Sequence, residues 1–243
     1  MNKKTKGILG LIVAFLCAIS FSVIGLDIQN LDFLSGYLNN DVSYGNEESI
    51  GSLIDTDEKF VEVNNNIPNF SDEDKTTTKN FENYSELDNL ERPGVAYAKI
   101  TKEIMPTEER GAIGHVKPAG WQTIKYDIVD GKYLYNRCHL IGFQLAGENA
   151  NKKNLITGTR YFNVEGMLPF ENQVADYVKE TDNSVLYRVT PIYEKENLVA
   201  SGVTIEAYSI EDKGQGICFY VYIPNTQPGI YIEYLTGESC LEN

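Results

Sequence analysis

The chain passes from stretches without hydrophobic periodicity to stretches in which apolar residues occupy every second position. Residues 27–59 are rich in Asn, Asp, Ser, Gly and Glu, and their apolar positions follow no period. A segment of this composition buries too little apolar surface to fold alone, so it predicts a flexible acidic tether. Alternation begins at Phe60 and is followed by the turn-forming residues 64–68, which predicts a folded domain over residues 60–243.

Two further stretches predict strands close to a histidine. Residues 95–100 and 123–129 are both strand-like. An Asp-Gly dipeptide follows the second stretch, so residues 123–129 and 132–137 are expected to form a hairpin with a short turn. This hairpin would place His139 at or just past the end of its second strand.

The second half of the chain predicts a loop, a short strand and then a meander. Residues 142–153 are polar and rich in small side chains, whereas residues 155–157 are apolar enough for a short strand. Beyond Asn183, Gly, Asn and Asp turns separate alternating runs that predict antiparallel strands at 185–193, 198–208, 217–223 and 229–235. The pattern as a whole predicts an α+β fold, a mixed and mainly antiparallel sheet with a helical insert.

The helical insert is predicted over residues 160–179, with an interruption around Gly166 and Pro169. Proline suits the first turn of a helix, so a second helical piece is expected to begin near Pro169. Glu171 falls outside the apolar face predicted for this piece, which consists of Phe170, Val174, Tyr177 and Val178.

The first 26 residues have the form of an export signal or a membrane anchor. Three lysines precede an uncharged run from Gly7 to Leu26, and about 20 apolar residues suffice to span a bilayer. Lysines before the run keep the N-terminus inside, so the chain after Leu26 is expected outside the cytoplasm. The sequence predicts a protein that is secreted, or anchored to the outer face of the cytoplasmic membrane through residues 7–26 if these remain uncleaved.

Charge is unevenly distributed along the 243 residues, whose net charge is −14. Residues 27–94 carry 4 Lys or Arg against 16 Asp or Glu, and residues 95–243 carry 14 against 19. This acidity argues against a nucleic-acid-binding protein with a broad basic surface. It leaves room for a local basic cleft, because residues 102–165 carry nine basic against seven acidic side chains.

Export permits disulfides, but the cysteines outside the first 26 residues are odd in number. They are Cys138, Cys218 and Cys240. At most one bridge can form within the chain, and a pair of Cys218 with Cys240 is our first expectation. The sequence does not determine the connectivity.

A set of polar residues spaced along the centre of the chain is the candidate for a catalytic site. It consists of Asn136-Arg137-Cys138-His139 and the downstream residues Asn154, Asn163 and Glu171. Hydrolysis of a phosphodiester needs an activated water and a cation that neutralises charge in the transition state. A histidine with an ordinary pKa near 6.5 can be the general base. An amide oxygen with a nearby carboxylate suffices for Mg²⁺, which keeps most of its waters.

Residues 105–177 resemble the DNA/RNA non-specific endonuclease family of the His-Me finger, or ββα-metal, superfamily. The Asp-Arg-Gly-His signature of that family stands here as Asn136-Arg137-Cys138-His139, which keeps the arginine and the histidine. Residues 154–172 are especially similar to the bacterial secreted and streptococcal-type members. The resemblance implies a ββα-metal motif inserted into the mainly antiparallel sheet.

The resemblance also implies roles for the site residues. His139 would be the general base, Asn163 the direct ligand of Mg²⁺, with Mn²⁺ as a substitute ion, and Glu171 the carboxylate that acts on the metal's waters. Asn154 would support the site or position substrate.

Two arginines complete the site that the resemblance implies. Arg137 would support the phosphate or the site, and Arg110 is the best positional candidate for an arginine near the scissile phosphate. The other histidine, His115, has no such set of residues spaced around it and is expected in a loop or in the core.

Some residues near the motif have two readings. Lys152, Lys153 and Arg160 are candidates for phosphate contacts, the alternative being a solvated face. Three tyrosines are candidates for base stacking, although aromatic residues in strands usually belong to the core; these are Tyr133, Tyr135 and Tyr161.

The leading interpretation is an exported, Mg²⁺-dependent endonuclease that cleaves DNA, with RNA as a second substrate, and the resemblance implies that it leaves 5′-phosphate ends. The alternative is a catalytically weak or silent nucleic-acid-binding or toxin-like module on the same fold. A Ca²⁺ or Zn²⁺ protein is not supported, because the sequence has no EF-hand loop and no Cys or His cluster. No protein partner is inferred.

Overall fold

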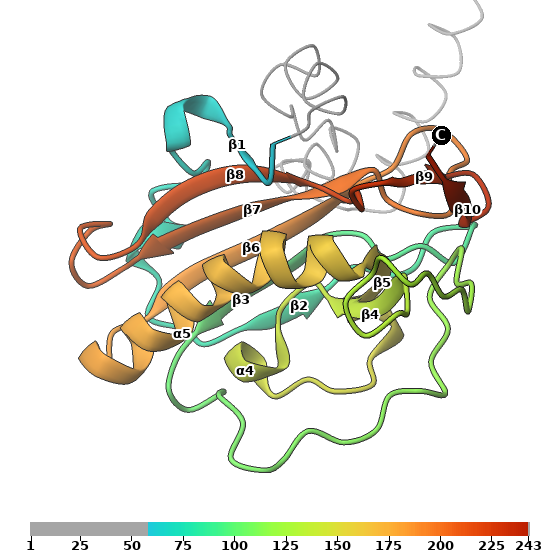
Figure 1. Ribbon diagram of the computed structural model, residues 1–243. Coiled ribbons are helices and arrows are strands. Elements are labelled where there is room, and N and C mark those ends of the chain that lie inside the picture. Colours follow the sequence, from blue (N-terminus) through green and yellow to red (C-terminus); the bar gives the residue numbers. More distant parts are fainter. Residues whose placement is uncertain (1–57, 243) are drawn as a thin grey trace, which may run out of the picture. The chain divides into compact units, whose positions relative to one another are not determined.

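A six-stranded antiparallel sheet is the centre of residues 58–242, which the computed structural model describes (Figure 1). The strand order is β1-β8-β7-β6-β3-β2. These strands are β1 (Val61–Glu62), β2 (Glu82–Tyr84), β3 (Ala96–Ile100), β6 (Val185–Ile192), β7 (Gly202–Ser209) and β8 (Cys218–Pro224). Every strand pair in the described residues is antiparallel, so the predicted α+β class with a mainly antiparallel sheet is confirmed.

The central strands are covered on both faces, which explains their nearly continuous burial. One face packs against the helical layer and builds the main core around Tyr187, Ile205 and Val221. The other face receives the segment between β1 and β2, where Phe70 stacks on Tyr97 with ring centroids 5.6 Å apart. The N-terminal part of the domain is therefore part of the packing of the sheet.

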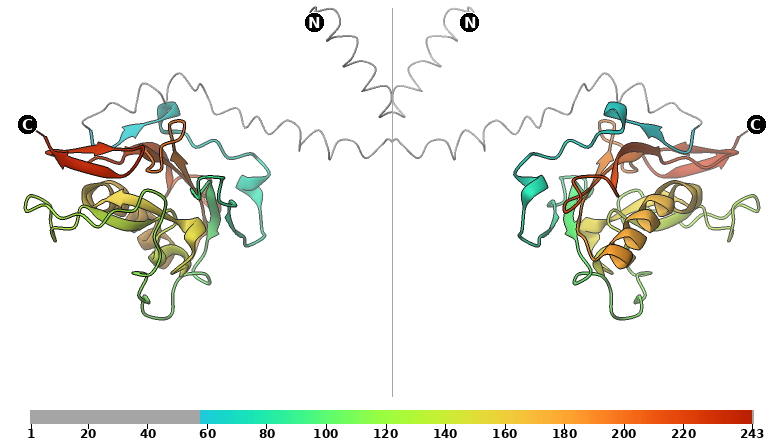
Figure 2. Two further views of the ribbon diagram at one scale, coloured as in Figure 1. Left: turned by 90° about the vertical axis from the view of Figure 1, so that its right-hand side faces the viewer. Right: turned by 90° about the vertical axis from the view of Figure 1, so that its left-hand side faces the viewer.

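The helical layer consists of one long helix and the strands that precede it. A π-helix, η5 (Phe162–Met167), runs directly into α5 (Leu168–Thr181). Two strands, β4 (Tyr135–His139) and β5 (Leu155–Thr159), pair with each other and form a small sheet of their own. Figure 2 shows these elements gathered on one side of the large sheet. The order β4, β5, α5 is the ββα arrangement that the family resemblance implied.

The connection between β4 and β5 contains short helices where a loop was predicted. These are α4 (Phe143–Ala146) and the 3-10 turn η4 (Lys152–Asn154). Gly147 ends α4 with φ of 67°, a left-handed conformation that glycine adopts without steric cost. Four residues of helix are too few to show periodicity in a sequence.

The predicted hairpin before β4 is wrong. Residues 123–129 do not form a strand, and the pairing with the following segment reduces to one bridge between Lys125 and Tyr133. The turn itself is present, since Gly131 and Lys132 have φ of 69° and 68°. Strand β4 instead takes its partner from β5, far along the chain, so the turn signal predicted the reversal but not the pairing.

The last strand of the predicted meander also lies elsewhere. Strands β6, β7 and β8 form the meander, but β9 (Ile230–Glu233) pairs with β10 (Glu238–Leu241) in a separate sheet. The chain leaves the large sheet at Asn225, a fully buried residue whose Nδ2 donates to the carbonyls of Thr157 and Ala200. The edge beside β8 is taken by β1.

The expected disulfide is absent, because Cys138, Cys218 and Cys240 are all free. Cys218 lies in β8 of the large sheet and Cys240 in β10 of the small one. The predicted leader, residues 1–26, and nearly all of the tether lie outside the described residues. Within residues 58–242 no helix has the length and apolar character needed to cross a membrane.

Candidate active site

A cleft of about 740 Å³ opens beside the ββα unit. Its walls come from the long excursion before β4, from β4 itself, from α4, and from the helix formed by η5 and α5. The residues that line it include Arg110, Trp121, Tyr133, Asn136, Arg137, His139, Gln144, Arg160, Asn163 and Glu171. The structure thus brings together most of the residues that the sequence singled out.

His139 is the last residue of β4, and only 6% of its surface is exposed. Its Nε2 lies 2.8 Å from the carbonyl oxygen of Asn149. A carbonyl only accepts, so Nε2 carries the hydrogen and Nδ1 is left with a lone pair. Nδ1 lies 3.3 Å from Nη2 of Arg110. Burial lowers the pKa of His139 to about 4, and the charge of Arg110 acts in the same direction. The imidazole is therefore a neutral base at physiological pH.

Asn154 holds the backbone that follows His139. Its Oδ1 accepts from the amide of Ile141 at 2.9 Å, and its Nδ2 donates to the carbonyl of Ile141 at 3.0 Å. The side chain is fully buried and does not line the cleft. Of the two roles that the resemblance implied, the geometry favours support of the site over contact with substrate.

Glu171 lies on the buried face of α5, so the prediction that it falls off that face is wrong. It shares the stripe with Val174, Ala175 and Val178, the spacing of one helix face. Burial raises the pKa of Glu171 to about 7, while a hydrogen bond from Gln144 and the charge of Arg110 oppose the shift. A carboxylate placed here is short of compensating positive charge.

The start of α4 is shaped around this carboxylate. A Cβ on Gly142 would lie 2.5 Å from Oε2 of Glu171, so the carboxylate packs directly against the Cα of Gly142. Gln144, also on α4, donates through Nε2 to Oδ1 of Asn172 at 2.9 Å. Neither residue was singled out in the sequence, because α4 was interpreted as a loop.

Asn163 faces the same cleft from the π-helix η5. Its side chain makes no hydrogen bond to any other described residue, which leaves the amide oxygen available. The interruption predicted around Gly166 and Pro169 is this π-helix, and the helix continues without a break. Pro169 lies in the first turn of α5, directly after the π-helix. Both Asn163 and Glu171 border the cleft.

The oxygen donors of this site fit a hard divalent cation. Asn163 offers a free amide oxygen, and Glu171 offers a buried carboxylate oxygen that borders the same cleft. Among residues 58–242 there is no group of three or more His, Cys, Asp or Glu side chains placed to hold a metal. An ion here would accordingly keep several waters, as Mg²⁺ does.

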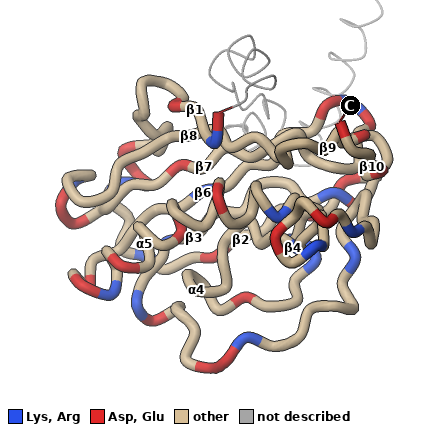
Figure 3. Tube along the Cα trace, viewed as in Figure 1, with Lys and Arg blue, Asp and Glu red and all other residues tan. Residues whose placement is uncertain are grey.

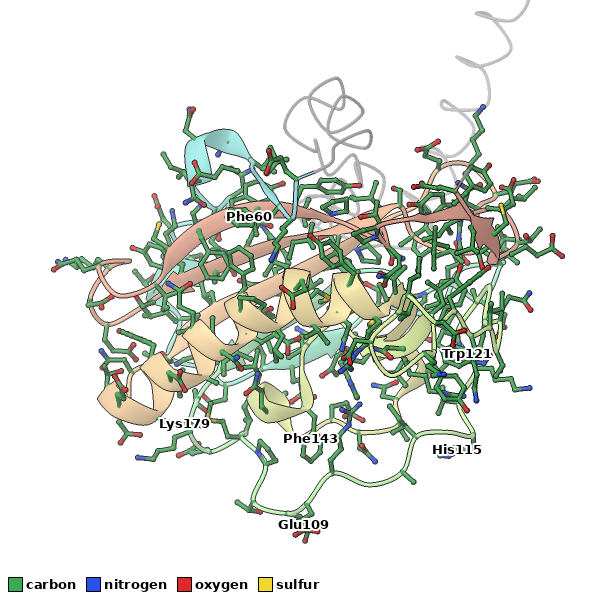
Figure 4. The ribbon with its side chains drawn as sticks, viewed as in Figure 1. Phe60, Glu109, His115, Trp121, Phe143 and Lys179 are labelled. Carbon is green, nitrogen blue, oxygen red and sulfur yellow. The ribbon has the colours of Figure 1, made fainter. Side chains whose placement is uncertain are left out.

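Arg137 ties the long excursion to β4. Its Nη2 donates to the carbonyl of Gly114 at 2.7 Å, and its Nε donates to the carbonyl of Val116. The guanidinium also lies 3.9 Å from the centroid of the Trp121 ring. Arg137 therefore supports the wall of the cleft. His115, in the same loop, is exposed (Figure 4), as expected of a loop residue.

The two residues that differ from the signature tetrapeptide, Asn136 and Cys138, lie in different surroundings. Asn136 borders the cleft, whereas Cys138 is fully buried in the main core. Alternation along β4 accounts for Cys138, which points away from the cleft that its neighbours Arg137 and His139 line. The Cys138 thiol packs over Gly158 on β5, where no Cβ competes for the space. Gly158 thus leaves room for the side chain of Cys138, which is larger than the glycine of the family signature.

The three predicted phosphate-binding cations have different surroundings. Arg160 lines the cleft and donates to Oδ2 of Asp130 at 3.1 and 2.9 Å. Lys153 pairs with Glu86 at 2.5 Å, and Lys152 pairs with Glu91. These two lysines do not line the cleft. Figure 3 shows Lys and Arg positions gathered around β4, within an otherwise mixed surface.

Comparison with known proteins places this geometry in context. The family model described as DNA/RNA non-specific endonuclease matches residues 68–211. The structure is similar to NucA from Streptococcus agalactiae with a bound magnesium ion, with 29% identity over 75% of this chain and 87% of that one and a TM-score of 0.66. It is also similar in fold to the Sda1 nuclease with a bound zinc ion, with 23% identity over 76% and 96% of the two chains and a TM-score of 0.62.

Proposed function

The chain belongs to the DNA/RNA non-specific endonuclease family, and from this premise we propose that it is an exported, Mg²⁺-dependent endonuclease. Its substrate is DNA, with RNA as a second substrate, and it cleaves without sequence preference. The observation that carries the proposal is the tautomer of His139. Its Nε2–H is fixed on the Asn149 carbonyl, which leaves the Nδ1 lone pair as the base in a cleft shared with Asn163 and Glu171.

The reaction begins with a water near Nδ1 of His139. The water oxygen forms a bond to phosphorus while its proton moves to Nδ1, and the hydrogen bond from Nε2 to Asn149 stabilises the imidazolium that results. The bond from phosphorus to the 3′ oxygen breaks, and that oxygen takes a proton from solvent. The products carry a 5′-phosphate and a 3′-hydroxyl.

Arg110 would bind the phosphate during the attack of the water. Its guanidinium contacts Nδ1 in the free protein, and it lies where an anionic phosphate oxygen would approach the base. A phosphate that draws Arg110 onto its own oxygen frees the Nδ1 lone pair for the water. Arginine suits this task because its planar fork of donors matches phosphate geometry.

Asn163 and Glu171 would hold the divalent ion. Such an ion would supply the positive charge that phosphodiester hydrolysis requires in its transition state. Magnesium is our choice because the donors are oxygens and few in number, and Mn²⁺ would substitute. The magnesium-bound NucA structure supports this choice.

Export rests on the first 26 residues, whose basic start and uncharged run are typical of a secretion signal or an anchor. The protein would then act outside the cytoplasm. Detection of the mature N-terminus by mass spectrometry would distinguish cleavage from anchoring.

Digestion of plasmid DNA tests the proposed activity. We expect cleavage in Mg²⁺, none in EDTA, and a loss of about 10²- to 10⁴-fold in His139→Ala. His115→Ala is the matched control, since His115 is the other histidine and is exposed in a loop. Full activity of His139→Ala would overturn the mechanism. Binding of DNA without cleavage under any divalent ion would favour the catalytically silent module.

A further inference from the structure

One wall of the cleft is aromatic and carries an exposed tyrosine that the core does not use. Tyr135 is 4% exposed and belongs to a small core with Leu134 and Ile230. Tyr133, two residues earlier, lines the cleft, is 48% exposed and is not a member of that core. Tyr135 is therefore a core residue, whereas packing in the core does not explain why position 133 carries a tyrosine.

The ring of Tyr133 is held in place from one side. Lys125 forms a bridge to Tyr133 through the backbone, and its Nζ lies 4.3 Å from the centroid of the ring. Such a cation over the face of an aromatic ring is attractive. The ring is thus supported by the protein, while 48% of the surface of this cleft-lining residue remains exposed.

Tyr133 lies on a path of positive charge that leads to the base. The cleft is also lined by Arg110, Arg137 and Arg160. Tyr133 precedes His139 by six positions, which along extended chain is roughly 20 Å. A short run of nucleotides spans that length, so one strand can touch the ring and the catalytic histidine together.

We propose that Tyr133 is a stacking platform for an unpaired nucleobase, and that the enzyme prefers single-stranded nucleic acid; this inference rests on the proposed nuclease function. An aromatic ring in a positively charged groove is the usual means of holding a single strand, because every base offers a π-face. Bases within a duplex are already stacked on each other, so the platform contributes nothing to a paired substrate.

Cleavage of a single-stranded oligonucleotide and of the same strand annealed to its complement tests the preference. Tyr133→Ala should lower kcat/KM for the single strand about ten-fold, mainly through KM, which is the scale of one lost base stack. The duplex should be affected less than about two-fold, and Tyr133→Phe should behave as wild type. Tyr231→Ala is the matched control, because Tyr231 is 54% exposed but does not line the cleft.

Abasic substitution locates the stack on the substrate. Removal of the base that meets Tyr133 should weaken the wild-type reaction to the level of Tyr133→Ala and should leave the variant unchanged. Equal losses on single strand and duplex, or no loss on either, would overturn the platform. Thermal unfolding of each variant confirms that the fold is retained.

Binding in EDTA separates this inference from the proposed activity. Fluorescence anisotropy of the labelled single strand reports the stack without cleavage, and Tyr133→Ala should again bind about ten-fold more weakly. If wild type cleaves nothing in Mg²⁺, the proposed function fails, yet weaker binding by Tyr133→Ala would still support the platform. Unchanged binding would overturn it.

Discussion

His139 shows how burial adapts a single side chain to its task. The ring donates to one backbone carbonyl, and the surroundings lower its pKa from 6.5 to about 4. Burial of the ring penalises the charged form, which is the main cause. The free protein therefore keeps a neutral base over the whole range in which it is expected to work.

The lowered pKa of His139 predicts acid sensitivity of the fold. A folded pKa below the unfolded one contributes stability that is full above pH 6.5 and is lost as the pH falls towards 4. The shift corresponds to about 3 kcal/mol. We compare wild type and His139→Gln by chemical denaturation from pH 7.5 to pH 4. The difference between their free energies of unfolding should shrink by about 3 kcal/mol over this range. Parallel curves for the two proteins would contradict the assignment.

The π-helix η5 is the element that places the candidate metal ligand. Gly166 lets it approach β8, since a Cβ there would lie 2.5 Å from Cγ2 of Ile223. The segment before β1 adds a second contact, because Lys59 pairs with Glu165 at 2.8 Å. Phe60, labelled in Figure 4, packs its ring edge-on against Phe170 of α5 with centroids 5.1 Å apart. The helix is thus held from two sides.

Gly166→Ala is predicted to disturb this element. The added methyl group must push η5 away from β8, which should destabilise the fold by about 1–3 kcal/mol. Asn163 moves with the helix, so Mg²⁺ affinity, measured by calorimetry, should fall as well. Gly114→Ala is the control, since a Cβ at Gly114 has open space around it. Unchanged stability and affinity in Gly166→Ala would refute the role of this contact.

Sequence patterns predicted elements with local signals and missed elements whose partners lie far away. The strands β6, β7 and β8 follow one another and were predicted, and so was the strand that ends at His139. The partner of β4 is β5, and residues 140–154 separate the two strands. No local hydrophobic period predicts a pairing between strands so far apart in the sequence. Residues 123–129, which lie next to β4 along the chain, were therefore predicted to be its partner. Motif spacing does not depend on which strands pair, and most of the residues that it singled out line one cleft.

At the scale of the whole molecule, acidic side chains neutralise part of the basic surface. Lys152 and Lys153 meet Glu91 and Glu86 of the segment between β2 and β3. Arg92 anchors this segment, since its Nη1 donates to the carbonyls of Lys195 and Asn197 at 2.9 and 2.8 Å. A net charge of −14 is thereby combined with a cleft that Arg110, Arg137 and Arg160 line.

This distribution predicts a weak dependence of nucleic-acid binding on salt. Each phosphate neutralised on a single strand contributes ~0.7 to the slope of log affinity against log salt concentration. Arg160 is already paired with Asp130, so the other two arginines of the cleft, Arg110 and Arg137, give about −1.4. The substitutions Glu86→Gln and Glu91→Gln free Lys152 and Lys153, and the slope should steepen towards about −2.8. Anisotropy titrations in EDTA over a range of NaCl concentrations measure both slopes. A slope near about −2.8 in wild type would mean that a bound strand already draws these lysines out of their ion pairs, and the acidic segment would then not restrict binding to the cleft.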